Sequence, residues 1–476
     1  MLVLCFVFYS CGDNQSSDPE SGGGGDIESA GAGNENLPVE DDTEVDLFVS
    51  DDLAEFDFGG SAFRIAVQDV SWLYVLYDTQ EETGELINDA VYQRNRKIEE
   101  RFNVELMQEP ADVAGIFRRN VQSGTDAFEL YLPVDREALV FGTEGMTYKL
   151  ADIPHIDINK PYWSQSLNSS LTINNDLYFA YGSFNLSVYD YTHLMLFDKQ
   201  MLADLAFESP YGLVSGGGWT FDVYEQMAKA AVNDLNGDGV MDDNDVYGLV
   251  SLDKHVLPCF WAAAGVESIS KSSDDIPQFT LIGDEKFASV IDKIFDITQG
   301  NDSWYSGRTE ITADKAMSGH ALFMNCTFKM VGDLRGIDTD FGIIPYPKYN
   351  AEQEKYYSRV EGGNPGIVPV TAGNLEMTGV ILEVLNAESA KTVIPAYYDI
   401  SLKTKDTRDE ESSKMLDLIF STRVYDLGDT YWSPILRDGM FLDMFSRNDR
   451  NLASHLERIE PRINSELEKV IAALAN

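Results

Sequence analysis

Basic residues, cysteines and long apolar runs are scarce in this chain of 476 residues. Only 35 Lys and Arg oppose 80 Asp and Glu, so the formal net charge is −45. Binding to nucleic-acid phosphates requires a basic surface, which this composition excludes. No stretch reaches the roughly 18 uninterrupted apolar residues of a membrane-spanning helix. We therefore expect neither a nucleic-acid-binding protein nor one that crosses a membrane.

Catalytic motifs with fixed spacing are also missing. The sequence has no Gly-x-Ser-x-Gly, no His-Glu-x-x-His and no Gly-x-x-x-x-Gly-Lys motif, and its five histidines are scattered. A chain this acidic always contains two carboxylates that could be assigned as the general acid and general base of a glycosidase. Asp190 and Glu361 are such a pair. The sequence therefore predicts a protein that is not an enzyme, with a surface glycosidase as the catalytic alternative.

The chain opens on an apolar run that ends at Ser10 and Cys11 and is followed at once by polar residues. This run resembles a bacterial lipoprotein signal, although it lacks a basic start and carries Phe8 where a small aliphatic residue is usual. The alternative is a short buried helix or strand. The resemblance implies a lipoprotein-type signal over residues 1–11, removal of Cys5, lipidation of Cys11, and anchoring to the outer face of the cytoplasmic membrane.

Residues 12–58 are rich in Gly, Ser, Asn and acids, which predicts a disordered acidic tether. Residues 1–63 hold 15 acids and no base, so residues 64–476 carry 65 acids, 35 bases and a net charge of −30. This charge favours a neutral ligand over a strongly anionic one. The two remaining cysteines, Cys259 and Cys326, form either one bridge or two separate buried thiols.

Apolar periodicity after residue 60 alternates between short strands and longer helices. Strands are expected at 63–67, 104–107, 128–132, 177–181 and 246–250. Helices are expected at 88–102, 113–123, 221–233, 284–299, 312–318, 375–387, 388–400, 409–423 and 451–474. This order predicts α/β units on largely parallel sheets, with a helical C-terminal part packed onto them.

The most specific local pattern is an acidic loop at residues 234–245. Counted from Asp234, side-chain oxygens fall at positions 1, 3, 5, 9 and 12, with glycine at 6, which is the pattern of an EF-hand loop. The predicted ligands are Asp234, Asn236, Asp238, the carbonyl of Val240, Asp242 and Asp245. A single loop followed by a strand indicates a structural Ca²⁺ site, and the alternative is an acidic turn that binds calcium only weakly.

Several stretches, each weak alone, occur in a specific order. They are the helix and strand at 88–104, Gly218-Trp-Thr-Phe-Asp222, the Asp-Val-Tyr-Gly at 245–248, Ala-Leu-Phe-Met-Asn at 321–325, 341–348, and 394–419. Together they resemble the extracellular solute-binding proteins of family 1, the receptors of bacterial carbohydrate importers. The resemblance covers nearly the whole chain from about residue 60.

The resemblance implies an α/β, two-lobed type II periplasmic-binding-protein fold with hinge crossings and a helical C-terminal part. Lobe 1 would comprise residues 60–183 and 345–400, and lobe 2 residues 187–343 and 401–476. The crossings would lie near 181–187 and 341–347.

The implied function is that of a monomeric, extracytoplasmic substrate-binding lipoprotein of an ABC importer. It would capture a neutral carbohydrate, an oligosaccharide in the leading interpretation, and pass it to permease subunits. An extracytoplasmic sensor or adhesion lipoprotein on the same fold is the second interpretation.

Sugar rings stack on flat aromatic faces, and their hydroxyls hydrogen-bond with carboxylates and amides. Candidate ligand-binding residues are therefore aromatic and polar side chains at strand ends and crossings, each of which competes with an ordinary structural role. They are Gln68, Trp72, Asn185, Asp190, Tyr191, Trp261, Asn325, Glu361 and Asn364. Trp72 and Trp261 are the predicted stacking platforms.

Overall fold

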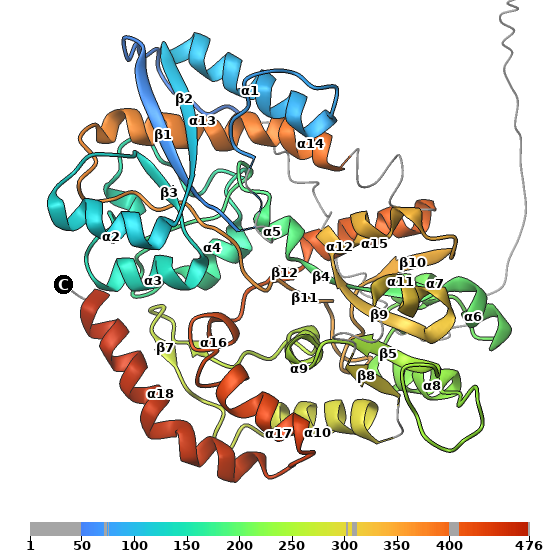
Figure 1. Cartoon of the computed structure of the whole chain (residues 1–476). Coiled ribbons are helices and arrows are strands. Elements are labelled where there is room, and N and C mark those ends of the chain that lie inside the picture. Colours follow the sequence, from blue (N-terminus) through green and yellow to red (C-terminus); the bar gives the residue numbers. More distant parts are fainter. Residues whose placement is uncertain are drawn as a thin grey trace, which may run out of the picture. The chain divides into compact units, whose positions relative to one another are not determined.

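The computed structural model describes residues 49–70, 74, 76–300, 303–306, 312–398 and 409–474 (Figure 1). These described residues belong to one compact unit. The predictions for the signal, Cys11, most of the tether and Trp72 fall outside the described residues. Within the described ranges, no helix combines the length and apolar character needed to span a membrane.

The first sheet is wholly parallel, with strand order β2-β1-β3. Its strands are β1 (Ser61–Gln68), β2 (Val104–Ala111) and β3 (Leu130–Leu132). The buried side chains of β1 point into two separate apolar cores, as expected for a parallel sheet covered on both faces. Helix α1 (Leu86–Phe102) contacts β2 and also packs on α13 (Leu375–Lys391), which returns from far along the chain.

The second sheet is mixed, with strand order β10-β4-β9-β5-β8. Its strands are β4 (His193–Asp198), β5 (Tyr247–Ser251), β8 (Trp304–Ser306), β9 (Ala321–Thr327) and β10 (Phe341–Ile344). β4 runs antiparallel to both β9 and β10, whereas β5 is parallel to β8 and β9. The prediction of parallel strands is therefore confirmed for the whole first sheet, but only for β5, β8 and β9 of the second.

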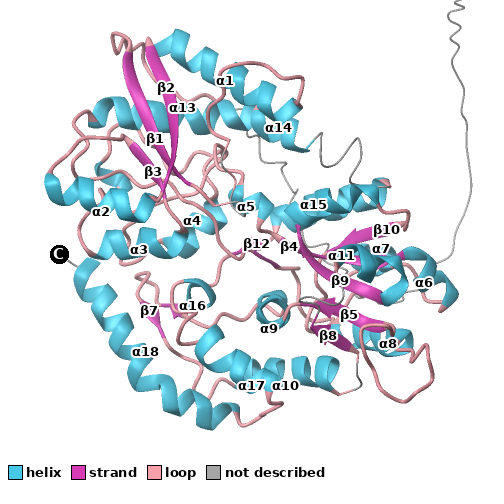
Figure 2. Ribbon diagram, in the orientation of Figure 1, coloured by secondary structure: helices cyan, strands magenta, loops and turns pink. Residues whose placement is uncertain are grey.

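Helices surround these sheets, as the ribbon in Figure 2 shows. The other longer helices are α2 (Val113–Ser123), α3 (Asp135–Thr143), α8 (Phe221–Ala231), α9 (Asp253–Ala263), α10 (Glu285–Gln299), α15 (Glu410–Ser421) and α18 (Leu452–Leu474). Shorter helices are α4 (Gln165–Leu171), α5 (Ser187–Asp190), α6 (Lys199–Asp204), α7 (Pro210–Ser215), α11 (Ala313–Lys315), α12 (Phe328–Asp333), α14 (Val393–Tyr398), α16 (Leu427–Thr430) and α17 (Leu442–Ser446).

The last quarter of the chain is mainly helical, as predicted, and it touches both parts of the molecule. α15 packs on β10 of the second sheet, and α18 contacts α3, which follows the first sheet. The short strand β12 (Arg423–Val424) pairs in parallel with β11 (Ser358–Arg359). Two further short strands, β6 (Ser270–Lys271) and β7 (Pro277–Gln278), form a separate antiparallel ribbon.

Two segments connect the part built on the first sheet with the part built on the second, and they lie side by side. The side-chain amide of Asn185 donates to the carbonyl oxygen of Asn364, whose own backbone N–H donates to Ser187 Oγ at 3.2 Å. Farther along, the N–H of Glu361 donates to the carbonyl oxygen of Tyr191 at 3.1 Å. These bonds run between residues 185–191 and 361–364, so the two crossings form one hydrogen-bonded unit.

The second crossing lies later in the chain than the resemblance implies. Residues 345–348 still belong with the second sheet, because Trp219 Nε1 donates to the Pro345 carbonyl oxygen at 3.0 Å and Thr220 bridges Lys348. The segment reaches the first sheet only where Ile367 bridges Tyr131 of β3. The expected crossing at 341–347 is therefore corrected to about 360–367. The other lobe boundaries remain predictions.

One predicted strand is wrong. Residues 177–181 form no strand, and only Ala180 makes an isolated bridge, to Gly366. The apolar run there is buried because it packs beside the second crossing, which explains why its composition resembles that of a strand.

Candidate functional site

A pocket of about 350 Å³ lies where the crossings meet the starts of two helices. Asp135 and Arg136, at the start of α3, form what we call the α3 wall. Lys254 at the start of α9, with Asp429 and Arg437, forms the α9 wall. The floor is made by Tyr191 and residues 361–363 of the crossings.

Strand direction explains why these two walls meet. α3 begins shortly after the carboxyl end of β3, and α9 begins shortly after the carboxyl end of β5. Each of these strands is parallel to at least one neighbour in its sheet. Ligands of α/β proteins bind beyond the carboxyl ends of parallel strands, so the pocket occupies the expected place for a ligand site.

A buried ion-pair network supports the α9 wall. Arg359 Nε lies 2.6 Å from Asp429 Oδ2, and both side chains are only 2% exposed. Arg437 Nη1 approaches the other oxygen of Asp429 at 3.1 Å and Glu361 Oε1 at 3.8 Å. Burial lowers the pKa of Arg359, but the carboxylates of Asp429 and Glu361 outweigh it and raise that pKa. The guanidinium therefore stays charged, and each oxygen of Asp429 is paired with one arginine.

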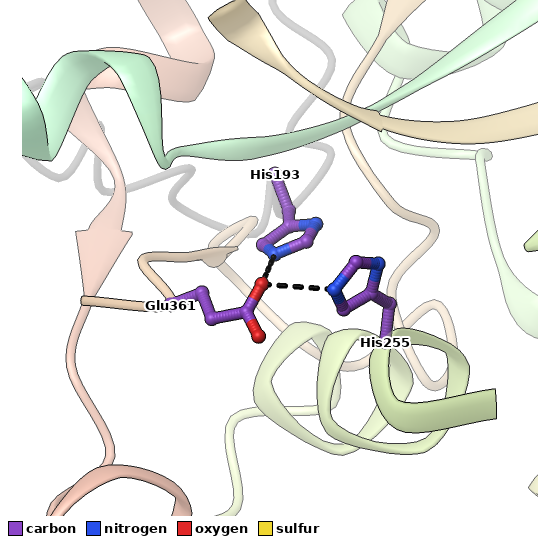
Figure 3. Close-up of side chains that lie close together, drawn as sticks. All are labelled: His193, His255 and Glu361. Carbon is purple, nitrogen blue, oxygen red and sulfur yellow. Dashed lines mark hydrogen bonds and ion pairs between the residues drawn. The ribbon is translucent and has the colours of Figure 1, made fainter. Parts of the chain in front are cut away.

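Two histidines from different elements point at Glu361 (Figure 3). His193 Nε2, on β4, lies 3.1 Å from Glu361 Oε2, and His255 Nε2, on α9, lies 2.9 Å from the same oxygen. Burial raises the pKa of Glu361, yet the nearby charge of Arg359 holds it well below its usual range. Burial and Arg359 lower the pKa of His193 to about 3, so its ring is neutral at physiological pH.

Among the described residues, these three side chains are also the one group whose ligand atoms converge closely enough for a metal ion, within 4.8 Å of one another. The surroundings oppose that use. Arg359 Nη1 lies 2.8 Å from His193 Nε2, and because a guanidinium only donates, it occupies the lone pair that a metal would require. Lys254 Nζ, 3.7 Å from Glu361 Oε1, adds a second cation. We therefore interpret the trio as a neutralised polar network.

Asp135 gives the α3 wall a carboxyl group with unusual acidity. It is 3% exposed and accepts a hydrogen bond from Tyr425 Oη at 2.6 Å. Burial raises its pKa to about 6, and the Tyr425 hydrogen bond opposes that rise only in part. Its neighbour Arg136 is exposed and forms no ion pair with any carboxylate in the described part of the chain.

The structure brings two of the predicted ligand-binding residues to this pocket. Tyr191 is half-buried on its floor, and Glu361 stands between its walls. Asn325 lies behind it, with its side-chain amide 3.2 Å from His193 Nδ1. The alternative pairing of Asp190 with Glu361 loses support, because Asp190 does not line the pocket and accepts a hydrogen bond from Tyr397 Oη at 2.6 Å.

The other described candidates have structural partners. Gln68 Oε1 accepts from the N–H of Val113, while Asn185 and Asn364 hold the crossings together. Trp261 is the clearest correction. Its side chain is fully buried, Phe441 packs on its ring at 5.2 Å, and its Nε1 donates to Asp426 at 3.0 Å. No face of Trp261 is left for a sugar to stack on.

Sequence reasoning missed the charged residues of both walls. Arg136, Lys254, Asp429 and Arg437 carry no motif, and only their position after a strand or in the C-terminal part sets them apart. His193 and His255 are 62 positions apart in the sequence, and only the fold brings both imidazoles to Glu361. The one usable signal was a repeated local pattern, in which an apolar residue, Asp and a base follow a strand at 134–136 and again at 252–254.

The predicted calcium loop adopts a tight, self-bonded turn. Asp234 accepts from the N–H groups of Gly237 at 2.7 Å and Gly239 at 2.8 Å, and both glycines have positive φ. Asp245 is buried and accepts from the N–H groups of Leu235 and Asp242. The oxygen-rich loop has donors suited to Ca²⁺, although its carboxylates do not form a described group converging within 4.8 Å. Cys259 and Cys326 are both free and buried.

Comparison with protein-family models finds no match, and comparison with curated proteins finds none. Solved structures do match. One is a cyclo/maltodextrin-binding protein complexed with maltotetraose, with a TM-score of 0.58 and 10% identity over 87% of this chain and 97% of that one.

Two further matches are similar in extent. An ABC substrate-binding protein from Listeria monocytogenes in complex with cycloalternan has a TM-score of 0.55 and 11% identity over 86% of this chain and 99% of its own. UgpB from Mycobacterium tuberculosis in complex with glycerophosphocholine has a TM-score of 0.56 and 13% identity over 87% of this chain and 99% of its own. The chain therefore has the α/β, two-lobed fold of the periplasmic-binding proteins.

Proposed function

We propose that this protein is the extracytoplasmic substrate-binding component of an ABC importer and that it captures a carbohydrate in the pocket between the α3 and α9 walls. The observation that carries the proposal is the pocket itself, because its two walls start two helices that follow strands of different sheets and its floor is the pair of crossings. A ligand held there would contact both parts of the molecule. The similarity in fold to binding proteins that hold maltotetraose and cycloalternan supports this proposal.

The pocket offers sugar-binding groups without an obvious catalytic pair. Tyr191 supplies an aromatic ring, and the carboxylates of Glu361 and Asp429 offer oxygens that accept hydrogen bonds from hydroxyl groups. Neighbouring cations hold the Glu361 carboxylate ionised, so it is not suited to donate a proton as a general acid, and Asp429 is ion-paired with two arginines. This chemistry favours binding over turnover.

Isothermal titration calorimetry with a panel of mono- and oligosaccharides, followed by a check for hydrolysis products, tests the proposal. We expect binding without product release. Tyr191→Ala should weaken binding about tenfold or more through the lost ring contact, whereas the matched control Tyr357→Ala, a half-buried tyrosine of a different pocket, should bind like the wild type. Release of products would favour a surface glycosidase, and the absence of any bound saccharide would favour a sensor or adhesion protein.

The proposed function includes a lipid anchor and permease partners. A lipid on Cys11 would hold the monomeric body at the outer face of the cytoplasmic membrane, near the permease subunits that receive the ligand. Cys11→Ala should then shift the protein from the membrane fraction to the soluble fraction. Retention of the variant in the membrane fraction would contradict lipid anchoring.

We also propose that residues 234–245 bind a structural Ca²⁺. Chelation should lower the melting temperature by a few degrees, because an ion that binds only the folded state stabilises it. Asp234→Ala should abolish this response, and Asp243→Ala, at a half-buried position that is not a predicted ligand, should keep it. An unchanged melting temperature on chelation of the wild type would contradict the proposal.

A further inference from the structure

We infer that the pocket selects a saccharide that carries a carboxylate group, which lies between Arg136 of the α3 wall and Lys254 of the α9 wall. This inference rests on the proposed function and names the chemical class of its ligand. The net charge of the whole body points to a neutral ligand, but a ligand responds most strongly to the charges nearest to it.

The first supporting observation is the matched position of the two cations. Arg136 is the second residue of α3, and Lys254 is the second residue of α9. In each helix the residue before the cation is an Asp whose Oδ1 accepts from the backbone N–H of the cation itself. The two cations thus extend from equivalent places in different parts of the fold, and both line the same pocket.

The second observation is that each acid of the pocket already has a hydrogen-bond or ion-pair partner. Asp429 is paired with Arg359 at 2.6 Å and Arg437 at 3.1 Å. Glu361 lies within 3.8 Å of the cationic groups of Arg359, Arg437 and Lys254, and Asp135 accepts a hydrogen bond from Tyr425 Oη. Within the described part of the chain, these three are the only acidic side chains lining the pocket.

Arg136 and Lys254 have fewer carboxylate contacts than Arg359 and Arg437. Arg136 is exposed and has no carboxylate partner among the described residues, and Lys254 has only a loose contact with Glu361 Oε1 at 3.7 Å while its side chain is 41% exposed. Arg359 adds positive charge behind the floor, and its Nη2 is buried without a hydrogen-bond partner. With Arg359 counted, four cations at the pocket face three acids, so the charge left over is positive, in contrast to the acidic body around it.

A carboxylated sugar fits this arrangement. Its carboxylate would accept charge-assisted hydrogen bonds from Arg136 and Lys254, and its hydroxyls would donate to Glu361 and Asp429. A pocket volume of about 350 Å³ is at the small end for ligand sites, which suits a short saccharide. The surrounding negative charge would disfavour ligands with several anionic groups.

Calorimetry tests this inference by comparing galacturonic acid with its neutral methyl ester and with galactose. Each compound is also tested as its disaccharide. Glucuronic acid and glucose form a second series. We expect the acid to bind at least tenfold more tightly than its ester, because a hydrogen bond between charged groups contributes more than one between neutral groups. Lys254→Met and Arg136→Met should each remove most of that preference, so that the acid and its ester bind with similar affinity. Both side chains are at the pocket rim, so the fold should tolerate the changes, which circular dichroism can verify.

The control is Lys286→Met, an exposed lysine of a different pocket, which should keep the wild-type preference. Equal or tighter binding of the esters and neutral sugars would overturn the inference while leaving the proposed function intact. Tighter binding of glycerophosphocholine than of any uronate would also overturn it, in favour of a phosphodiester ligand. If no saccharide binds, the result would instead contradict the proposed function, on which this inference rests.

Discussion

The two walls of the pocket begin alike and are supported differently. Each follows a strand with an apolar residue, an Asp and a base, at 134–136 and at 252–254. The α3 wall rests on one buried carboxyl, Asp135, and its tyrosine partner, whereas the α9 wall rests on a network of two arginines, Asp429 and Glu361. The comparison shows that the same local sequence supplies the cation in both walls, while the surrounding fold decides how much neighbouring charge is neutralised.

The largest expected effect is the loss of the network behind the α9 wall. Arg359→Met would leave Asp429 buried with a single partner, and breaking a buried pair in this way typically costs about 3–5 kcal/mol of unfolding free energy. Urea denaturation measures this cost. Lys254→Met, which removes a half-exposed cation of the same wall, should cost less than about 1 kcal/mol. Equal costs for the two variants would show that the network does not stabilise the wall.

An intermediate effect is expected from Asp135 on the α3 wall. Its folded-state pKa of about 6 is above the unfolded value of 3.8, so the folded state holds the proton more tightly. The stability that comes from the protonated carboxyl is fully present below pH 3.8 and is lost as the pH rises through about 6. Asp135→Asn stays neutral, so it should abolish this loss and raise the unfolding free energy at pH 7 by up to about 3 kcal/mol.

Unfolding free energies of the wild type and Asp135→Asn across pH 4–7 provide the measurement. The two curves should diverge above pH 4. Parallel curves would mean that Asp135 titrates normally and that the α3 wall holds no buried neutral carboxyl.

The smallest effect is expected deeper in α9. Trp261→Phe keeps the buried ring but removes the hydrogen bond from Nε1 to Asp426, which retains its bonds from Ser268 and Gly428. The loss should be about 1–2 kcal/mol of unfolding free energy, with saccharide affinity unchanged. A large loss of affinity without loss of stability would return Trp261 to the ligand site.

Much of the fold was predictable because its signals are local. The apolar alternation of 63–67 and the helical periodicity of 284–299 match β1 and α10 closely. The strand at 177–181 was wrong because burial beside a crossing produces the same apolar run as burial in a sheet. The position of the second crossing was wrong because the backbone bonds that keep Lys348 beside Trp219 leave no pattern in the sequence.

The candidate site was less predictable. Tyr191 was found because it flanks the first crossing, whereas Glu361 was chosen as following a crossing predicted at 341–347 and lies within the corrected one. Arg136 and Lys254 were missed because a base near a helix start is ordinary until the fold places two of them at one pocket. Trp261 was misjudged because a tryptophan at a ligand site and one in a core look the same in sequence.

Hydrogen–deuterium exchange of the protein with and without a bound saccharide tests the central claim most directly. If the pocket between the walls holds the ligand, saccharide should slow exchange at residues 134–137, 253–256 and 361–363 together, since these segments line it from both sides. The separate pocket lined by residues 150–177 should be unaffected. Slowed exchange at 150–177 alone, with the two walls unchanged, would contradict the account.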